Sequence, residues 1–127
     1  MVYADANILI RFIINDDEAM AVRAAAAIDS GSLFVLPEVI AETVYVLTKV
    51  YGIDRADVAD TMLELLTSVS TIAPAVMHNA LAYYRESTLD FVDCILASHR
   101  LTDGKMVFTF DKKLNNFIAR KEAAGES

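Results

Sequence analysis

The chain has 127 residues, a net charge of −7 and a hydrophobic fraction of 55%. This length predicts one domain, which would bury roughly two-thirds of the unfolded surface, and the hydrophobic fraction argues against disorder. The apolar stretch 2–14 is interrupted by Asp5, Asn7 and Arg11, which is typical neither of a signal peptide nor of a membrane span. The one cysteine, Cys94, excludes an internal disulfide, indicates a cytoplasmic protein and fits an apolar core position.

Charge is distributed unevenly along the chain. Residues 1–99 carry 14 acids and 5 bases, whereas residues 100–127 carry 6 bases and 4 acids. The basic end is either a solvated terminal helix or a rim that contacts phosphates. Overall acidity weakens non-specific binding to nucleic acids, because neutralised phosphates supply most of that affinity. Any contact with nucleic acid is therefore expected to be local and assisted by metal.

Apolar runs alternate with helical periodicity along the chain, which predicts βα units and a mainly parallel sheet. The strands are expected at 2–4, 33–36, 69–72 and 106–110. Gly and Pro punctuate the helices, with Pro at favoured first positions and Gly after the last turn. The helices are expected at 7–14, 18–29, from Pro37 to Gly52, after Asp54, from Pro74 to about Glu86, at 90–102 and at 112–121. In the helix that begins at Pro37, one apolar stripe is expected to face the core, formed by Ile40, Val44, Leu47 and Tyr51.

Four acids stand in otherwise apolar surroundings: Asp5, Glu42, Asp93 and Asp111. Each follows a strand or lies early in a helix that follows a loop, so an open sheet could bring all four to one edge. Carboxylates within ~4–6 Å of one another raise one another's pKa strongly unless cations compensate. A Mg²⁺ or Mn²⁺ ion would compensate, because hard cations prefer carboxylate oxygens.

Taken one at a time, these acids have simpler interpretations. Asp5 and Asp111 would cap the helices that follow them. The other two would be ordinary exposed acids, paired with Lys49 and Arg100. With only 5 bases among the first 99 residues, side-chain pairing cannot serve every acid, which favours a shared metal.

Metal held by carboxylates activates water and neutralises the charge that builds on a phosphate. The chain has no Gly-rich phosphate loop, nucleophile motif or dinucleotide fingerprint, so phosphodiester hydrolysis is the chemistry that remains. A phosphatase with Asp5 as covalent nucleophile would need a second Asp where Asn7 stands. A receiver-like acidic binding module would need an Asp after the third strand, where the chain has Ala73 and Pro74.

Several short motifs resemble those of the PIN-domain ribonucleases. They are Asp5-Ala6-Asn7, the run Leu36–Glu42 with Tyr45-Val46-Leu47, the run Leu89–Ala97, and Thr109-Phe110-Asp111. Together they resemble the single-domain VapC-type toxins of toxin–antitoxin pairs. An inactive PIN-like binding module is the alternative within this family, although all four acids are present.

The resemblance implies a three-layer α/β/α PIN-like domain over residues 1–121, with a mainly parallel four- or five-stranded sheet flanked by helices and a frayed tail at 122–127. No final strand follows the last helix, unlike in many family members. Asp5, Glu42, Asp93 and Asp111 fall on the metal-binding, catalytic acids of the family, with Asp90 as the substitute for Asp93. The supporting polar positions are Asn7 and Thr109, and the candidate RNA phosphate contacts are Arg100, Lys112 and Lys113.

The same resemblance implies how such a protein would act. It implies a Mg²⁺- or Mn²⁺-dependent endoribonuclease that forms homodimers. It also implies a cognate antitoxin protein that occludes the site and recruits the pair to operator DNA. No membrane partner is expected.

Overall fold

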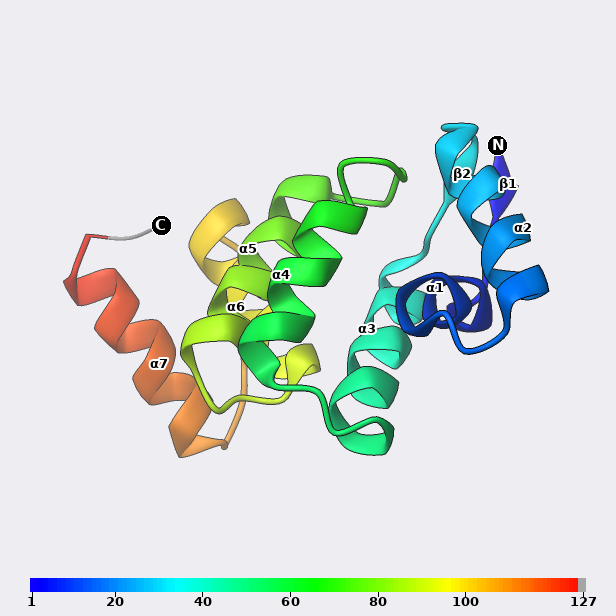
Figure 1. Cartoon of the computed structure of the whole chain (residues 1–127). Coiled ribbons are helices and arrows are strands. Elements are labelled where there is room, and N and C mark those ends of the chain that lie inside the picture. The colour runs from blue at the N-terminus through cyan, green and yellow to red at the C-terminus, as the bar shows by residue number, and fades with distance from the viewer. Residues whose placement is uncertain (126–127) are drawn as a thin grey trace.

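Helices make up most of the computed structural model, which describes residues 1–125 (Figure 1). The elements in chain order are β1 (Val2–Tyr3), α1 (Ala6–Ile14), α2 (Glu18–Asp29), β2 (Leu33–Phe34), α3 (Pro37–Tyr45), the π-helix η1 (Val46–Val50), α4 (Arg55–Leu65), α5 (Pro74–Glu86), α6 (Phe91–Asp103) and α7 (Lys112–Ala123). The two strands lie with α1, α2 and α3 at one end of the molecule, and α7 lies at the other end. No helix in this part of the chain is long and apolar enough to cross a membrane.

The predicted helices are all present, with small differences at their ends. The π-helix η1 continues α3 through Val50, and α7 runs on through Ala123. Glu126 and Ser127, which belong to the predicted tail 122–127, lie outside the described residues.

The sheet is parallel, as predicted, but short. β1 pairs with β2, so that Val2 lies opposite Leu33 and Tyr3 opposite Phe34. Ser70 forms a single parallel bridge with Phe34, in which its N–H donates to the carbonyl of Leu33 at 3.0 Å. The third predicted strand is therefore reduced to one bridge.

The four- or five-stranded sheet is not found among residues 1–125, which contain two strands and this bridge. The segment 106–110, predicted as a strand, has no backbone hydrogen bond to another strand in this part of the chain. Its side chains Met106, Phe108 and Phe110 are 86%, 88% and 90% exposed. In Figure 1 the segment runs between α6 and α7, away from β1. A strand needs a neighbour for its backbone groups, and here β1 is not close enough to supply one.

The core is formed where the helices face one another. Its fully buried side chains include Leu9, Ile40, Leu47, Met62, Leu81 and Leu114, which come from six different elements. Burial of each such side chain contributes about 1.5–3 kcal/mol, so this cluster supplies most of the stabilisation that the short sheet cannot.

The π-helix η1 changes which side chains face the core after α3. Ile40, Val44 and Leu47 are buried as the helical stripe predicts, but Tyr51 is 41% exposed. The wider turn of η1 rotates the residues that follow it away from the stripe. The prediction that Tyr51 continues the stripe was therefore wrong.

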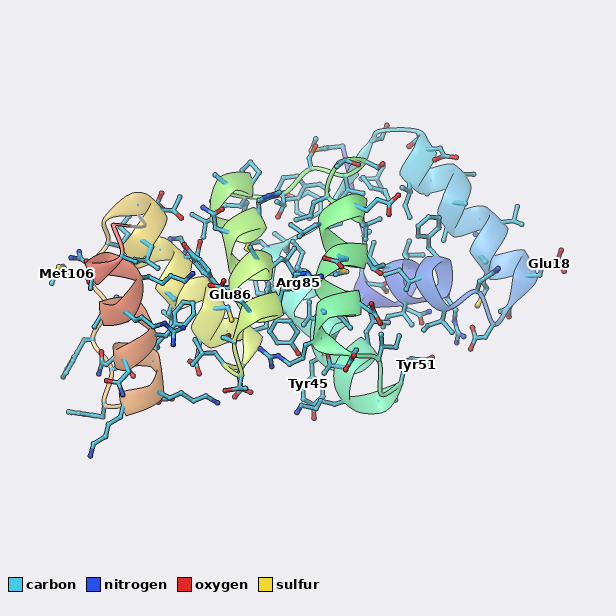
Figure 2. The ribbon with its side chains drawn as sticks, turned by 60° about the vertical axis from the view of Figure 1, so that its left-hand side comes forward. Glu18, Tyr45, Tyr51, Arg85, Glu86 and Met106 are labelled. Atoms are coloured by element: carbon cyan, nitrogen blue, oxygen red, sulfur yellow. The ribbon has the colours of Figure 1, made fainter. Side chains whose placement is uncertain are left out.

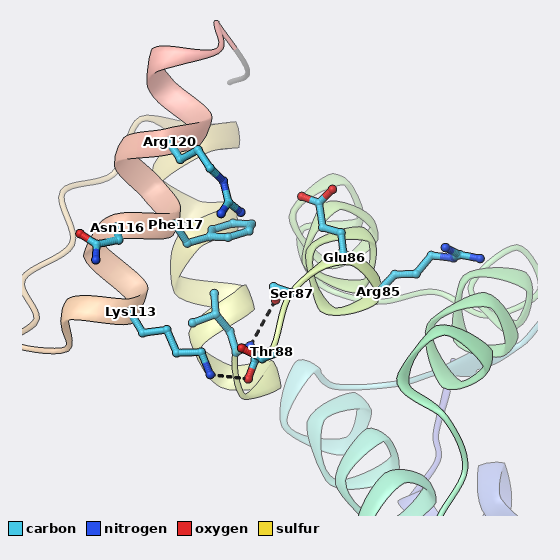
Figure 3. Close-up of a pocket in the computed structure, with 9 residues that line it drawn as sticks. Arg85, Glu86, Ser87, Thr88, Lys113, Asn116, Phe117 and Arg120 are labelled. Carbon is cyan, nitrogen blue, oxygen red and sulfur yellow. Dashed lines mark hydrogen bonds between the residues drawn. The ribbon is translucent and has the colours of Figure 1, made fainter.

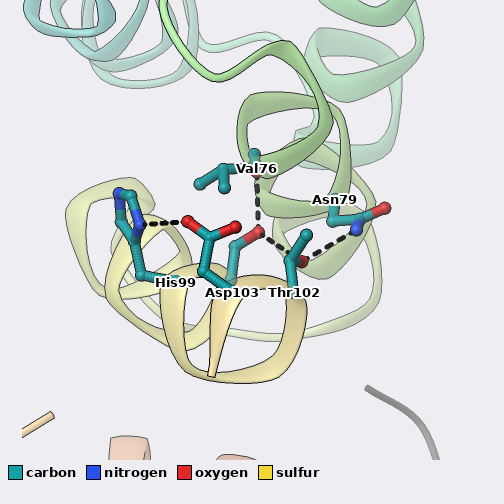
Figure 4. Close-up of polar contacts among 6 residues, drawn as sticks. Val76, Asn79, His99, Thr102 and Asp103 are labelled. Carbon is teal, nitrogen blue, oxygen red and sulfur yellow. Dashed lines mark hydrogen bonds and ion pairs between the residues drawn. The ribbon is translucent and has the colours of Figure 1, made fainter. Parts of the chain in front are cut away.

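Polar contacts fix α6 against α5 near the C-terminal end of α6 (Figure 4). Ser98 Oγ donates to the carbonyl of Val76 at 2.7 Å, and Asn79 Nδ2 donates to Thr102 Oγ1 at 2.9 Å. Cys94 is fully buried on the same helix, and burial raises its pKa to about 12, as expected of a core residue and not of a nucleophile. These contacts hold α6 in place against α5, and Asp93 lies in the first turn of the same helix.

Candidate functional site

Two of the four acids cap helices. Asp5 Oδ1 accepts the N–H of Ile8 at 3.2 Å at the start of α1. Asp111 Oδ1 accepts the N–H groups of Lys113 and Leu114 at 2.9 and 3.3 Å at the start of α7. The simpler interpretation of these acids is therefore correct, but each cap uses only Oδ1. The Oδ2 atom of each exposed carboxylate remains available to another ligand.

Asp93 lies in the first turn of α6 and is partly buried. Burial raises the pKa of Asp93, and the charges of Asp111 and Asp90 raise it further, while Lys113 opposes them. The structure thus brings three predicted acids from the starts of α6 and α7 into one electrostatic neighbourhood. A divalent cation would relieve the repulsion among them.

Asp5 and Glu42 are exposed and do not join this cluster. Among residues 1–125, no three Asp, Glu, His or Cys side chains lie close enough together to hold one metal ion. The physical reason lies in the sheet. Segment 106–110, which leads to Asp111, is not paired with β1, which leads to Asp5.

The ion pairs expected for Glu42 and Asp93, with Lys49 and Arg100, are absent from the described part of the chain. Lys49 does not pair with Glu42, and Arg100 donates to Glu122 at 3.0 Å and not to Asp93. Arg100 is thereby engaged at the surface, which weakens its candidacy as a phosphate contact. None of the four acids forms an ion pair with a basic side chain among residues 1–125.

The supporting polar residues occupy different settings. Thr109 Oγ1 accepts the N–H of Asp111 at 3.1 Å, and its carbonyl accepts from Asn115 Nδ2 at 2.9 Å. Thr109 therefore holds the turn that presents Asp111. Asn7 is exposed in the first turn of α1, and Asp90 is exposed just before α6.

A basic cavity of about 420 Å³ lies beside this cluster, between the end of α5 and α7 (Figure 3). Lys113, on its wall, donates from Nζ to the carbonyl of Thr88 at 2.8 Å. Arg120, which sequence reasoning missed, lies with its guanidinium carbon 5.3 Å from the ring centroid of Phe117. Arg85 points toward α4, where it pairs with Asp60 at 2.9 Å.

The charge balance of this cavity is positive. Its acid, Glu86, is paired with Lys121, so Lys113 and Arg120 supply the net charge at its wall. Lys112 is exposed one residue before Lys113. Lys112 and Lys113 thus stay candidate phosphate contacts, and Arg120 joins them.

A second cavity, of about 300 Å³, opens on the other side of Asp93, between α3 with η1 and the start of α6. Its rim carries Tyr45 and Lys49, which sequence reasoning did not select. The sequence did contain a signal for these two residues, because both lie off the apolar stripe of the helix that begins at Pro37. The aromatic ring of Tyr45 is therefore expected at the surface, where exposed apolar groups often mark a binding site.

The donor set fits a hard divalent cation in its chemistry. Carboxylate oxygens are the ligands that Mg²⁺ and Mn²⁺ prefer, and Asp93 and Asp111 are close to each other without a neutralising ion pair. Asp90 adds a third carboxylate to the same neighbourhood. The chemistry of the site therefore fits a metal, while the described conformation gathers only part of the donor set.

The chain matches the PIN domain family model over residues 2–119. This match covers most of the chain, so the protein belongs to the PIN domain family. PIN domains are generally nucleases and generally use divalent metal ions, and membership suggests RNA binding. Comparison with curated proteins and with solved structures gives no significant match.

Proposed function

We propose that this PIN domain is a Mg²⁺- or Mn²⁺-dependent endoribonuclease. The observation that supports this most is the raised pKa of Asp93 beside Asp111 and Asp90, in a chain of the PIN family. Acids held close together, here with only Lys113 to offset them in part, are costly in a fold, and such arrangements concentrate at functional sites. Cleavage of RNA phosphodiester bonds is the reaction that this arrangement serves best.

In this proposal Asp5, Glu42 and Asp93 hold the metal, directly or through waters, and Asp111 completes the site. When bound, the cation would supply an activated water and neutralise charge on the phosphate. The contribution of the chain itself is to hold and orient these groups. The turn at Thr109 fixes Asp111, and the cap at Ile8 fixes Asp5.

Basic residues of α7 would hold the RNA strand next to the acids. Lys113 is close enough to Asp93 to lower its pKa, and it also lines the basic cavity. A phosphate bound by Lys113, Lys112 or Arg120 would place the neighbouring phosphate near the carboxylates. The rest of the surface is acidic, so this strip would guide the strand.

We further propose that the protein is a VapC-like cytoplasmic toxin, paired with a cognate antitoxin and acting as a homodimer. Its length and its four motifs support this, as does the exposed apolar segment 106–110. Apolar patches of this kind mark protein interfaces. Contact with operator DNA would come only through the antitoxin.

The rival functions find less support. A phosphatase with Asp5 as covalent nucleophile would need a second Asp where this chain has Asn7. A receiver-like module would need an acid where this chain has Ala73. Membership of the PIN family argues against both. An inactive PIN-like module would have no reason to keep all four acids, none of which forms an ion pair among residues 1–125.

Cleavage of a labelled single-stranded RNA in Mg²⁺, with EDTA as the metal-free comparison, tests the nuclease proposal. Wild type should cut only with metal, and Asp93→Asn should lose at least about 100-fold in rate because a metal ligand is removed. Asp57→Asn, an exposed acid of α4, is the matched control and should cut normally. Equal rates with and without metal would contradict the proposal.

Expression in a bacterial host tests the toxin proposal separately. Growth should stop on induction of wild type and continue on induction of Asp93→Asn. If a small protein is encoded beside this gene, as the proposal expects of an antitoxin, its coexpression should restore growth. Unimpaired growth with active wild-type protein present would contradict the toxin role and leave the nuclease proposal standing.

A further inference from the structure

The cavity of about 300 Å³ between α3, η1 and the start of α6 contains features that the metal-binding acids do not explain. It joins an apolar floor to an exposed aromatic ring, a lysine and the carboxylate of Asp93. This volume lies at the lower end of the roughly 300–1,000 Å³ of small-molecule sites. We propose that it is a subsite for one unpaired nucleobase of RNA, stacked on Tyr45 with its phosphate on Lys49.

The floor of the cavity is preformed. The guanidinium carbon of Arg55 lies 3.6 Å from the ring centroid of Tyr84, and Arg55 also donates to the carbonyls of Tyr84 and Leu89 at 3.0 and 2.6 Å. The hydroxyl of Tyr84 donates to Thr48 Oγ1 at 2.9 Å. Phe91 meets the Tyr84 ring edge-on at 5.7 Å between centroids. A ligand would therefore not have to order this surface on binding.

The rim offers the groups that bind an unpaired nucleotide. Tyr45 is 62% exposed, and Figure 2 shows it beside the end of α3, on the side of η1 that faces α6. Lys49 follows four residues later, near the same face, and forms no ion pair among residues 1–125. Proteins recognise unpaired RNA by stacking bases on aromatic rings and binding the backbone with cations.

The position of the cavity links it to the proposed chemistry. Asp93 and Asp90 line its far side, so a nucleotide stacked on Tyr45 would lie directly beside the acids. The π-helix η1 begins at the residue after Tyr45 and contains Lys49. Single π turns are rare and occur often at functional sites. This inference rests on the proposed ribonuclease function and names the part of the substrate that is recognised.

Binding of a short 5′-fluorescein single-stranded RNA of mixed sequence, measured by anisotropy in EDTA, tests the subsite without cleavage. Tyr45→Ala should weaken binding about tenfold, the effect of losing one base–aromatic stack, and Tyr45→Phe should bind like wild type. Tyr51→Ala is the matched control: Tyr51 is 41% exposed at the end of η1 but does not line the cavity, and its loss should change nothing. Lys49→Gln should reduce the salt dependence by about 0.7 in the log–log slope.

Two results would overturn the subsite in distinguishable ways. If wild type cleaves RNA in Mg²⁺ and Tyr45→Ala binds RNA as tightly as wild type, the subsite is wrong and the nuclease proposal stands. If wild type neither binds nor cleaves RNA, the proposed function fails, and the subsite fails with it. Thermal melting by circular dichroism confirms that each variant is folded, which the exposure of Tyr45 leads us to expect.

Discussion

Asp93 and Asp111, at the starts of consecutive helices, lie close enough that the charge of Asp111 adds to burial in raising the pKa of Asp93. Lys113, two residues into α7 from Asp111, only partly offsets this effect. The fold therefore holds a carboxylate in a setting that disfavours its charged form. A bound cation would reverse that preference, and this relationship leads to the predictions on pH and metal.

Asp93→Asn should stabilise the metal-free protein at neutral pH. Because the folded pKa of Asp93 lies above its ordinary value of 3.8, the folded state holds this proton more tightly than the unfolded chain. The contribution of Asp93 to the free energy of unfolding is therefore fully present below pH 3.8 and is lost as the pH rises through the pKa of the folded state. Urea unfolding should show the variant more stable than wild type at pH 7, and the difference should vanish below the ordinary pKa. A less stable variant at pH 7 would contradict this electrostatic account.

Divalent metal should stabilise the wild-type protein more than the Asp93→Asn variant. A ligand that binds only the folded state raises the free energy of unfolding by about 2.7 kcal/mol at 100 times its Kd. The Tm of wild type should therefore rise with Mn²⁺ concentration, and the Tm of Asp93→Asn should rise much less. Equal shifts in the two proteins would place metal binding elsewhere.

Arg55→Met should destabilise the protein by about 1–3 kcal/mol. The change removes the Arg55 hydrogen bonds to the carbonyls of Tyr84 and Leu89, leaves the Leu89 carbonyl only the weak thiol donor of Cys94 at 3.9 Å, and removes the cation from the ring of Tyr84. Arg85→Met is the matched control, because Arg85 forms an exposed pair with Asp60 at 2.9 Å. Urea titration of both variants measures the difference, and an equal effect of the two would show that Arg55 does not support the cavity floor.

Ala73→Gly should stabilise the protein by about 1 kcal/mol. Ala73 has φ of +50°, a left-handed conformation that costs a residue with a Cβ atom about 1–2 kcal/mol. Glycine adopts it freely but loses more backbone entropy on folding, which removes part of the gain. The shift in Tm is the measurement, with Ala75→Gly, in the first turn of α5, expected to destabilise instead.

The helices could be predicted because their signals are local. Pro37 and Pro74 open α3 and α5, and Gly104 ends α6 at φ of +70°, where its N–H bonds to the carbonyl of Arg100. The pairing of segment 106–110 depends on a distant partner, so its apolar run predicted a strand that the structure does not pair.

The four acids of the candidate site could likewise be selected from the sequence, whereas the distances between their side chains could not be predicted. Whether Asp5 approaches Asp111 depends on the sheet between them. The exposure of Tyr51 could not be predicted either. It depends on where η1 departs from α-helical geometry, and nothing in the local residues marks that point.

We propose that the four acids act as one metal-dependent site, although the described conformation leaves Asp5 and Glu42 outside the Asp93 cluster. The most direct test is the rate of Mg²⁺-dependent RNA cleavage by Asp5→Asn and Glu42→Gln. Asn caps a helix as well as Asp, so Asp5→Asn should stay folded, and Glu38→Gln, an exposed acid one turn before Glu42, is the control. We expect losses of at least about 100-fold in both test variants and none in the control. Wild-type rates in Asp5→Asn or Glu42→Gln would contradict a single four-acid site.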